Sequence, residues 1–184
     1  MDPKRERPPE AYERLASSRE RVRAALLKAG FTEESFSFSS ASIGVLYRQN
    51  EKGWNTNEVE RYELHQSASV ESPDVALVER TSKTITSLIR EGIEVTSDPP
   101  NFYYTGLDAL KIEMVGEAAR DARVRAERLA QEGGASLGEL ASATQGVFQI
   151  TSRYSSEVSA GGMYDTHSPL KNVRAVLTAT FAVQ

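Results

Sequence analysis

The chain has 184 residues, of which 39% are hydrophobic and 26% are charged, a balance typical of a folded globular protein. Its formal net charge is −4. Nucleic-acid-binding proteins usually carry a basic excess that neutralises phosphates, so we expect no nucleic-acid partner. The sequence contains no cysteine, which excludes disulfides, thiolate metal ligands and a cysteine nucleophile. It shows neither a signal peptide nor the apolar run of about 20 residues that a membrane span needs.

The N-terminal part predicts a short lead-in followed by a helix. Residues 1–9 are mostly charged and end in two prolines, which indicates a flexible segment. Residues 10–29 carry apolar side chains at the spacing of one helix face, and Gly30 follows where a helix is expected to end. The predicted apolar face consists of Tyr12, Leu15, Val22, Leu26 and Ala29.

Two extended segments are predicted next. Residues 35–40 alternate serine with apolar or small side chains, so they predict a strand that continues to about residue 47 after a shift of phase near Ala41. Residues 50–57 contain Gly53 and several asparagines, which is typical of a hairpin loop. A second, longer strand is expected over residues 61–70.

A second helix is predicted from Ser72, because a capping serine, a proline and an acid stand in succession there. Gly92 is its expected end. Short strands are predicted at residues 93–95 and 101–104, on either side of a break at Asp98-Pro99-Pro100.

Residues 107–132 predict the longest helix, with Thr105 as its cap and Asp108 completing a capping box. A narrow stripe of small and apolar side chains is expected to lie against a sheet. The stripe consists of Leu107, Leu110, Met114, Ala118, Ala122, Ala126 and Leu129. The opposite face, with Lys111, Arg123 and several acids, is expected to lie in solvent and to form ion pairs such as Glu117–Arg120 and Asp121–Arg125.

The C-terminal part predicts extended structure over residues 137–151, a polar loop over residues 152–169 and a final strand over residues 173–183. The order helix–strand–strand thus occurs about three times. We therefore predict an α+β fold with helices packed on a largely antiparallel sheet. Residues 10–184 are interpreted as one domain. Because no strand precedes the first helix, one sheet edge is expected to be bare or to be covered by a partner chain.

The sequence predicts no catalytic, cofactor-binding or metal-binding residues and no cofactor. Asp165, His167 and Ser168 stand close together, but a hydrolase triad depends on geometry rather than nearness in sequence. His65 and Glu63 form a single weak pair of metal ligands. Of the chemistry-bearing segments, the glycine- and tyrosine-containing loop 154–168 is the candidate interaction loop. Its candidate residues are Tyr154, Tyr164, Asp165 and His167.

Three motifs resemble the SIMPL-domain family. The first is residues 102–111 (FYYTGLDALK), which continue into the charged and alanine-rich residues 117–127. The others are residues 146–150 (GVFQI) and residues 171–176 (KNVRAV), separated by a loop of variable length. The likeness covers nearly the whole chain, and the central helix with the two strands after it is its specific part.

The resemblance implies an α+β fold without an established enzymatic activity and, in some members, a large ring-like or channel-like oligomer. Members include bacterial periplasmic and outer-membrane-associated immunogenic proteins, and some are labelled oxidative-stress defence proteins. The family name comes from a eukaryotic member that associates with a pelle-like kinase. Relatives normally begin with a signal peptide or anchor and a strand before the first helix. This chain shows neither, so we expect a trimmed start or a short variant.

Three functional hypotheses follow. The first is a non-enzymatic bacterial cell-envelope protein of unknown role that acts by self-assembly into homo-oligomers. The second is a module that binds a protein partner or a small ligand through the loop 154–168. The third is a hydrolase that uses Asp165, His167 and Ser168. The resemblance implies a periplasmic or envelope location, whereas the sequence itself, without a signal peptide, leaves a cytoplasmic location open.

Overall fold

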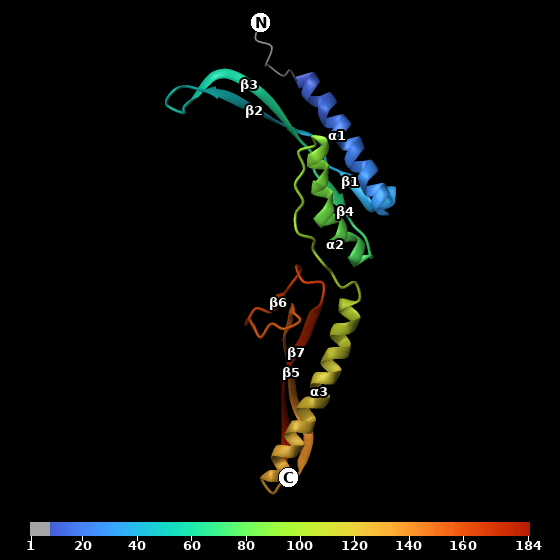
Figure 1. The fold of residues 1–184 in the computed structure, drawn as a ribbon. Helices are drawn as coiled ribbons and strands as arrows, with labels where there is room; N and C mark the ends of the chain where they lie inside the picture. The colour runs from blue at the N-terminus through green and yellow to red at the C-terminus, as the bar shows by residue number, and fades with distance from the viewer. Residues whose placement is uncertain (1–7) are drawn as a thin grey trace. The chain divides into compact units, whose positions relative to one another are not determined.

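The computed structural model describes residues 8–184 and confirms the α+β class (Figure 1). Most of the predicted lead-in therefore lies outside the described residues. The chain forms two compact units, Met1–Pro100 and Asn101–Gln184. The first contains helices α1 (Pro8–Ala29) and α2 (Val75–Thr84), and the second contains α3 (Leu107–Glu132). Among the described residues, no helix is long and apolar enough to cross a membrane.

The core of the first unit lies between α1, α2 and a short two-stranded sheet. Strand β1 (Phe36–Phe38) pairs antiparallel with β4 (Ala68–Val70). Leu26 of α1, Phe31, Phe36 of β1 and Leu77 of α2 form one buried cluster. The predicted apolar face of α1 thus supplies Leu26 directly, with Val22 and Ala29 packed against the cluster.

The two long strands predicted before α2 are each divided in two. Strand β2 (Ser42–Gln49) pairs with β3 (Asn55–His65), whereas β1 pairs with β4. The breaks fall at residues 39–41 and 66–67. The Gln66 side chain and the Ser67 backbone N–H both donate to Ser39 across this junction, at 2.6 and 3.0 Å. The two predicted strands therefore remain partners of each other, and their pairing is interrupted at this junction.

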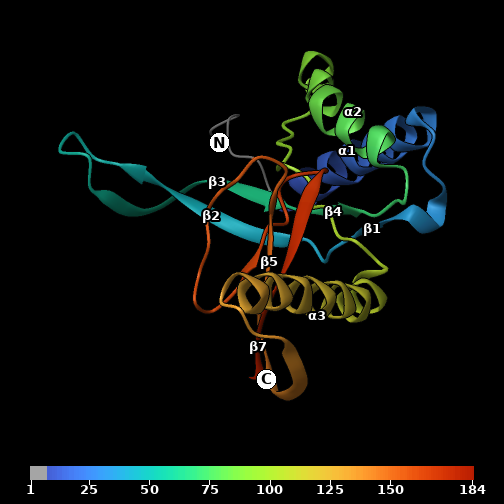
Figure 2. The ribbon, with the colours of Figure 1, turned by 90° about the horizontal axis from the view of Figure 1, so that it is seen from below.

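Strands β2 and β3 form a ribbon that extends beyond α1 (Figure 2). Its turn is closed by Asn50, whose side-chain oxygen accepts from the backbone N–H groups of Lys52 and Trp54, each at 3.0 Å. Cross-strand pairs place six apolar residues on one face, because directly opposed side chains point the same way. These pairs are Ile43–Leu64, Val45–Tyr62 and Tyr47–Val59.

Helix α2 begins two residues later than the sequence indicated. Asp74, not Ser72, is the N-cap, and its carboxylate accepts from the Leu77 backbone N–H at 2.9 Å. The Ser72 hydroxyl instead accepts from the Asp74 backbone N–H. The helix continues as the 3-10 helix η2 (Ile85–Glu91) and ends, as predicted, at Gly92, which has a left-handed φ of 79°.

The strands predicted at residues 93–95 and 101–104 do not form. Residues 93–104 run without regular structure between η2 and α3, because no other strand of the described chain pairs with them. Between β4 and α3 the described chain contains α2 and η2 but no strands. The middle αββ unit is therefore incomplete, and the predicted threefold repeat is not confirmed.

Helix α3 has the predicted bounds, but its ends differ in detail. Its N-cap is Gly106 rather than Thr105, and no side chain caps it. Leu129 was assigned to the buried stripe but is 75% exposed, because its neighbour Ala130 takes the buried position. Lys111 was assigned to the solvent face but is half-buried, with its ammonium 6.0 Å from the centre of the Phe148 ring.

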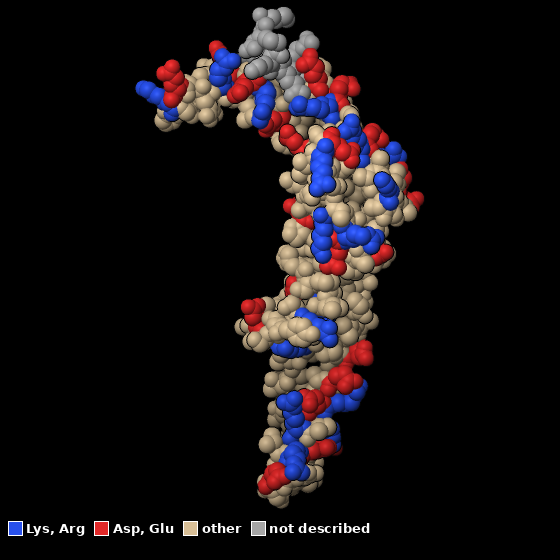
Figure 3. Space-filling view, in the orientation of Figure 1, with Lys and Arg blue, Asp and Glu red and all other residues tan. Residues whose placement is uncertain are grey.

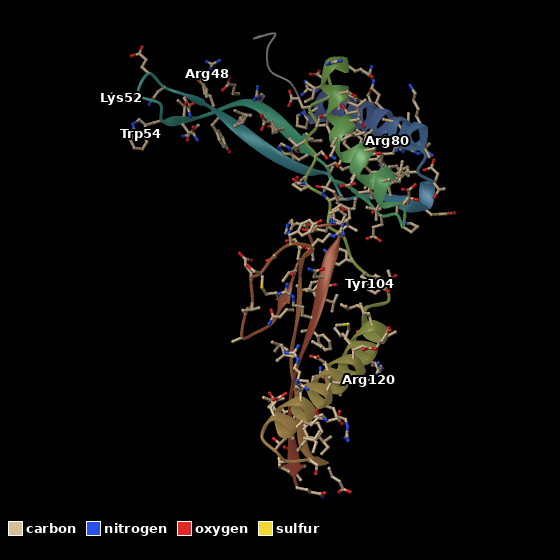
Figure 4. The ribbon with its side chains drawn as sticks, turned by 60° about the horizontal axis from the view of Figure 1, so that its bottom comes forward. Arg48, Lys52, Trp54, Arg80, Tyr104 and Arg120 are labelled. Atoms are coloured by element: carbon tan, nitrogen blue, oxygen red, sulfur yellow. The ribbon has the colours of Figure 1, made fainter. Side chains whose placement is uncertain are left out.

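The charged side of α3 carries the expected ion pairs. Arg120 contacts Glu117 at 2.6 Å, and Arg125 contacts Asp121 at 2.9 Å. Arg120 is labelled in Figure 4. All four side chains are more than half exposed, so these pairs add at most a few tenths of a kcal/mol each.

The sheet of the second unit has the order β6-β5-β7. Strand β5 (Leu137–Ser152) pairs antiparallel with β7 (Lys171–Val183) and, at its end, parallel with the short β6 (Met163–Tyr164). Three register shifts interrupt the β5–β7 ladder, and at each shift β5 carries the extra residue. Strand β7 is therefore regular, and β5 is bulged. The predicted loop 152–169 is confirmed except for β6 and for Ser152, which is the last residue of β5.

Candidate functional site

The two tyrosines of the candidate interaction loop lie in different surroundings. Tyr164 belongs to β6 and pairs with Ile150 of β5. Tyr154 lies after the end of β5 and is 88% exposed, with the Arg153 guanidinium 5.3 Å from its ring centre. The structure therefore holds Tyr164 in a sheet and leaves Tyr154 free to contact a partner.

Asp165 is held by Lys171, the first residue of β7. The Lys171 ammonium donates to the backbone oxygens of Asp165 and Ser168, at 2.5 and 2.7 Å. It also lies 3.7 Å from Oδ2 of Asp165, and the two side chains are only 12% and 18% exposed. That oxygen is buried without a hydrogen bond of its own among the described residues. Lys171 thus ties the end of the loop to the sheet.

The surroundings of Asp165 favour its charged form. The neighbouring Ser168 hydroxyl, the backbone N–H of His167 and the Lys171 ammonium lower the pKa of Asp165 below its ordinary value of 3.8, and partial desolvation opposes them. The carboxylate is therefore stabilised as an anion that balances Lys171, which differs from the raised pKa of a general acid.

Asp165, His167 and Ser168 do not adopt the arrangement of a catalytic triad. The His167 backbone N–H donates to Oδ1 of Asp165 at 2.9 Å, which is the bond of a tight turn. The exposed His167 ring makes no hydrogen bond or ion pair with the described residues, so no imidazole links the carboxylate to the serine hydroxyl. A triad requires that link.

A cavity of about 320 Å³ opens beside the loop. Hydroxyl groups and two carboxylates dominate its lining, together with one aromatic ring. The lining residues are Thr151, Ser152, Ser155, Glu157, Met163, Tyr164, Asp165 and Ser168. Of the predicted interaction residues, Tyr164 and Asp165 therefore meet at this cavity, whereas Tyr154 and His167 do not line it.

The pair His65 and Glu63 is an exposed ion contact, with 3.9 Å between Nε2 and Oε2. Glu63 also accepts from Arg61 at 2.7 Å, so its carboxylate already has a cationic partner. Among residues 8–184, no three metal-ligating side chains gather at one place. On the face drawn in Figure 3, basic and acidic side chains are interspersed.

A larger groove in the first unit was not predicted from the sequence. It has a volume of about 560 Å³ and lies between α1, α2 and the β1–β4 sheet. Its apolar lining includes Val22, Phe38, Val78 and Ile85, and its rim carries many serines. The one signal in the sequence was the serine alternation near residue 40, which we interpreted only as a strand.

The free edge of β7 is the second surface that sequence analysis did not locate. In the sheet order β6-β5-β7, this strand has a neighbour on one side only among residues 8–184. From Ala175 to Val183 it contains no charge, proline or glycine. Charged residues and prolines on natural edge strands usually prevent pairing with other chains.

The sequence model of one family matches residues 4–181 of the chain. That family is SIMPL, described as a protein of unknown function (DUF541). The chain belongs to the SIMPL family. No curated protein shows a significant sequence match to the chain.

The SIMPL match includes both compact units, since it runs from before α1 almost to the end of β7. It therefore covers the groove of the first unit and the loop, cavity and free edge of the second. The family description assigns this SIMPL protein no activity, so its function has to be argued from these surfaces.

Proposed function

We propose that this SIMPL protein is non-enzymatic and acts by self-assembly, with the free edge of β7 joining two copies. The observation that carries the proposal is the combination of length, regularity and missing charge at this edge. Strand β7 has 13 residues, and every extra residue of the β5–β7 ladder lies in β5. Bulges hinder the pairing of a sheet edge with another chain. The bulged β5 is therefore protected from such pairing, whereas the regular β7 can pair.

Pairing of β7 with its counterpart would be self-complementary. Two antiparallel copies of residues 175–183 would form a continuous sheet with twofold symmetry, the commonest symmetry of homo-oligomers. Helix α3 contacts both β5 and β7, and no described strand pairs with the outer edge of β7. Exposed Thr178 and Thr180 lie on the face away from α3, where β-branched threonine favours pairing.

The β2–β3 ribbon offers a second contact surface. Ile43, Val45 and Tyr47 on its apolar face are each at least 40% exposed, and Trp54 at the tip is 71% exposed. Figure 4 shows Trp54 and Lys52 at the end of the ribbon. A two-stranded ribbon is only marginally stable alone. Covering this face with another copy would stabilise the ribbon and extend a dimer into a larger assembly.

The double substitution Thr178→Lys and Thr180→Lys tests the β7 edge. In the symmetric pairing the introduced ammonium groups of one copy face those of the other at about 5 Å. Two such pairs at about 1 kcal/mol each would raise the dissociation constant about 30-fold. Light scattering after size exclusion should give the monomer mass of 20.2 kDa for the variant and a multiple of it for the wild type.

The matched control is Ser142→Lys with Thr144→Lys. These residues lie directly opposite Thr180 and Thr178 in the ladder, on the bulged strand β5. The control adds the same charge to the same sheet but leaves the β7 edge unchanged, so it should assemble like the wild type. A wild type that stays monomeric at every concentration would disprove self-assembly. Equal loss of assembly in both variants would disprove the assignment to β7.

We also propose a cell-envelope location, which rests on the family resemblance. Fractionation of a bacterial source that expresses the native gene would test it. The protein should be released with the periplasmic fraction or remain with the envelope. Recovery only with cytoplasmic markers would contradict the location without affecting the assembly proposal.

The alternative function is a binding module at the loop 154–168. The observation in its favour is the hydroxyl-lined cavity beside Tyr164, which suits a small polyhydroxylated ligand with one ring face to stack on. Thermal-shift measurements with glucose, galactose and N-acetylglucosamine would test it. At least one sugar should raise the melting temperature of the wild type but not of Tyr164→Ala. No shift with any of them would remove this alternative.

A further inference from the structure

Residues 93–98 have the side-chain pattern of a β-strand. Ile93 is 4% exposed, Val95 and Ser97 are half-buried, and the residues between them are exposed. An alternation of period two is what an extended chain shows when one face lies against a core. The sequence predicted a short strand at residues 93–95 from the same alternation.

The same segment pairs with no strand in the part of the chain that the structure describes. The backbone N–H of Ile93 donates to Leu88 at 3.2 Å, and the next bonded amide of the chain is that of Phe102. Residues 94–98 make no hydrogen bond, through backbone or side chain, with the rest of the described chain. Figure 1 accordingly draws this stretch as a thin coil after α2. An extended backbone with free donors and acceptors is a template for an added strand.

The groove of the first unit lies along this segment. All of residues 93–98 line it, together with apolar side chains from α1, α2 and the β1–β4 sheet. Its volume of about 560 Å³ is typical of a binding groove. A strand added beside residues 93–98 would direct alternate side chains into this groove, where apolar residues would be buried.

The acidic side chains of residues 93–98 indicate the charge that a partner strand should carry. Glu94 and Asp98 lie on the exposed face of the segment, four residues apart, and neither forms an ion pair with the described residues. Arg61 forms its ion pair with Glu63 at 2.7 Å, and Glu94 is a weaker electrostatic neighbour of its guanidinium. Arg19 also lines the groove, but its guanidinium lies 5.0 Å above the Phe38 ring. Carboxylates therefore outnumber cations along the groove.

We propose that residues 93–98 bind an extended segment of a partner protein in which apolar residues alternate with basic ones. The partner strand pairs with the free backbone of the segment, its apolar side chains enter the groove, and its Lys or Arg residues lie opposite Glu94 and Asp98. This site is in the first unit and is independent of the β7 edge through which the protein is proposed to assemble.

A labelled peptide tests the proposal against the full chain. The acetylated and amidated peptide Val-Lys-Val-Thr-Val-Lys-Val reads the same in both directions, so it fits a parallel or an antiparallel pairing. Fluorescence anisotropy should show saturable binding. The peptide with Glu in place of both Lys should bind about tenfold more weakly, since each opposed charge pair changes a cross-strand contact by up to about fivefold.

The double variant Glu94→Lys with Asp98→Lys is the decisive control. Both residues are exposed, so the variant is expected to fold, and circular dichroism checks this. It should reverse the preference and bind the Glu peptide more tightly than the Lys peptide. An unchanged preference, or no saturable binding of the Lys peptide to the wild type, would overturn the proposal.

Backbone pairing is tested separately. Two versions of the peptide carry N-methyl groups on alternate residues, one on the even and one on the odd positions. Because a strand turns only every second N–H toward a given neighbour, methylation of one set should abolish binding and methylation of the other should preserve it. If both versions bind, or neither does, the added strand is refuted. The Thr178→Lys and Thr180→Lys variant should bind the peptide like the wild type, which separates this site from assembly.

Discussion

Replacing Lys171 by Met should loosen the loop of the second unit while keeping its length and apolar stem. The ammonium holds three oxygens at the end of the loop, two of them backbone carbonyls of residues 165 and 168. The nearly buried side chain leaves little space for water to replace it. The variant thus leaves the Asp165 carboxylate without its counter-charge and the two carbonyls without their donor.

The substitution should lower the free energy needed to open the loop by about 2–3 kcal/mol. A hydrogen bond from a charged donor contributes about 1.5–3 kcal/mol. We take the upper part of this range for one bond, because the half-buried residues 165 and 168 recover bonds to water only in part. This free energy corresponds to a factor of about 30–150 in an equilibrium constant. The backbone N–H of Asp165 donates to Ile150 at 2.9 Å, so its hydrogen exchange reports opening of the loop directly.

Amide exchange measured by NMR at pH 7 should therefore be about 30–150-fold faster for Asp165 in Lys171→Met than in the wild type. The control is Lys52→Met at the tip of the β2–β3 ribbon, which removes an exposed ammonium and should leave this exchange rate unchanged. A change of less than about threefold in Lys171→Met would refute the reasoning, since it would show that water replaces the ammonium at little cost.

Four further outcomes follow from the structure. The pKa of the Asp165 carboxyl is lowered in the folded state, so its ionised form stabilises the fold. This stabilisation should be present above pH 3.8 and disappear as the pH falls through the lower folded-state pKa. Urea unfolding midpoints measured as a function of pH would show the loss. Leu26→Ala should cost about 2–5 kcal/mol in urea unfolding, because Leu26 is 3% exposed in the core cluster. Asp74→Ala should cost about 1 kcal/mol in the same assay by removing the cap of α2. Gly162→Ala should lower the melting temperature, since Gly162 has a φ of +85° and an added Cβ would lie 3.0 Å from the Phe148 oxygen.

The elements that the sequence predicted well are those whose signal is local. Helix α3 has the expected bounds because its repeat of small residues continues along most of the helix and glycines follow its end. Its cap was wrong, since Thr105 and Gly106 are both plausible N-caps and only the path of the preceding coil distinguishes them. The position of Leu129 was wrong because a one-residue change in phase near a helix end decides which neighbour is buried.

The hairpin around residues 50–57 was predicted correctly, but whether residues 93–98 have a strand neighbour could not be predicted from the sequence. The pattern of residues 93–98 is that of a strand, and the side chains do alternate in burial, but a strand also needs a neighbour. The bends at residues 39–41 and 66–67 likewise depend on contacts between distant segments, such as Gln66 with Ser39. The loop 154–168 was located correctly, whereas the groove was missed because its walls come from five separate parts of the chain.

The uneven β5–β7 ladder also determines where this chain can change in length. Strand β5 already contains three extra residues beside a regular β7, so another insertion there would add a bulge and leave both flanks in register. A single insertion in β7 would reverse the faces of every residue after it and turn Phe181 away from Arg123 of α3, whose guanidinium lies 6.0 Å from its ring centre. Among related sequences, insertions and deletions should therefore occur in β5 and the loop after it, while β7 keeps its length.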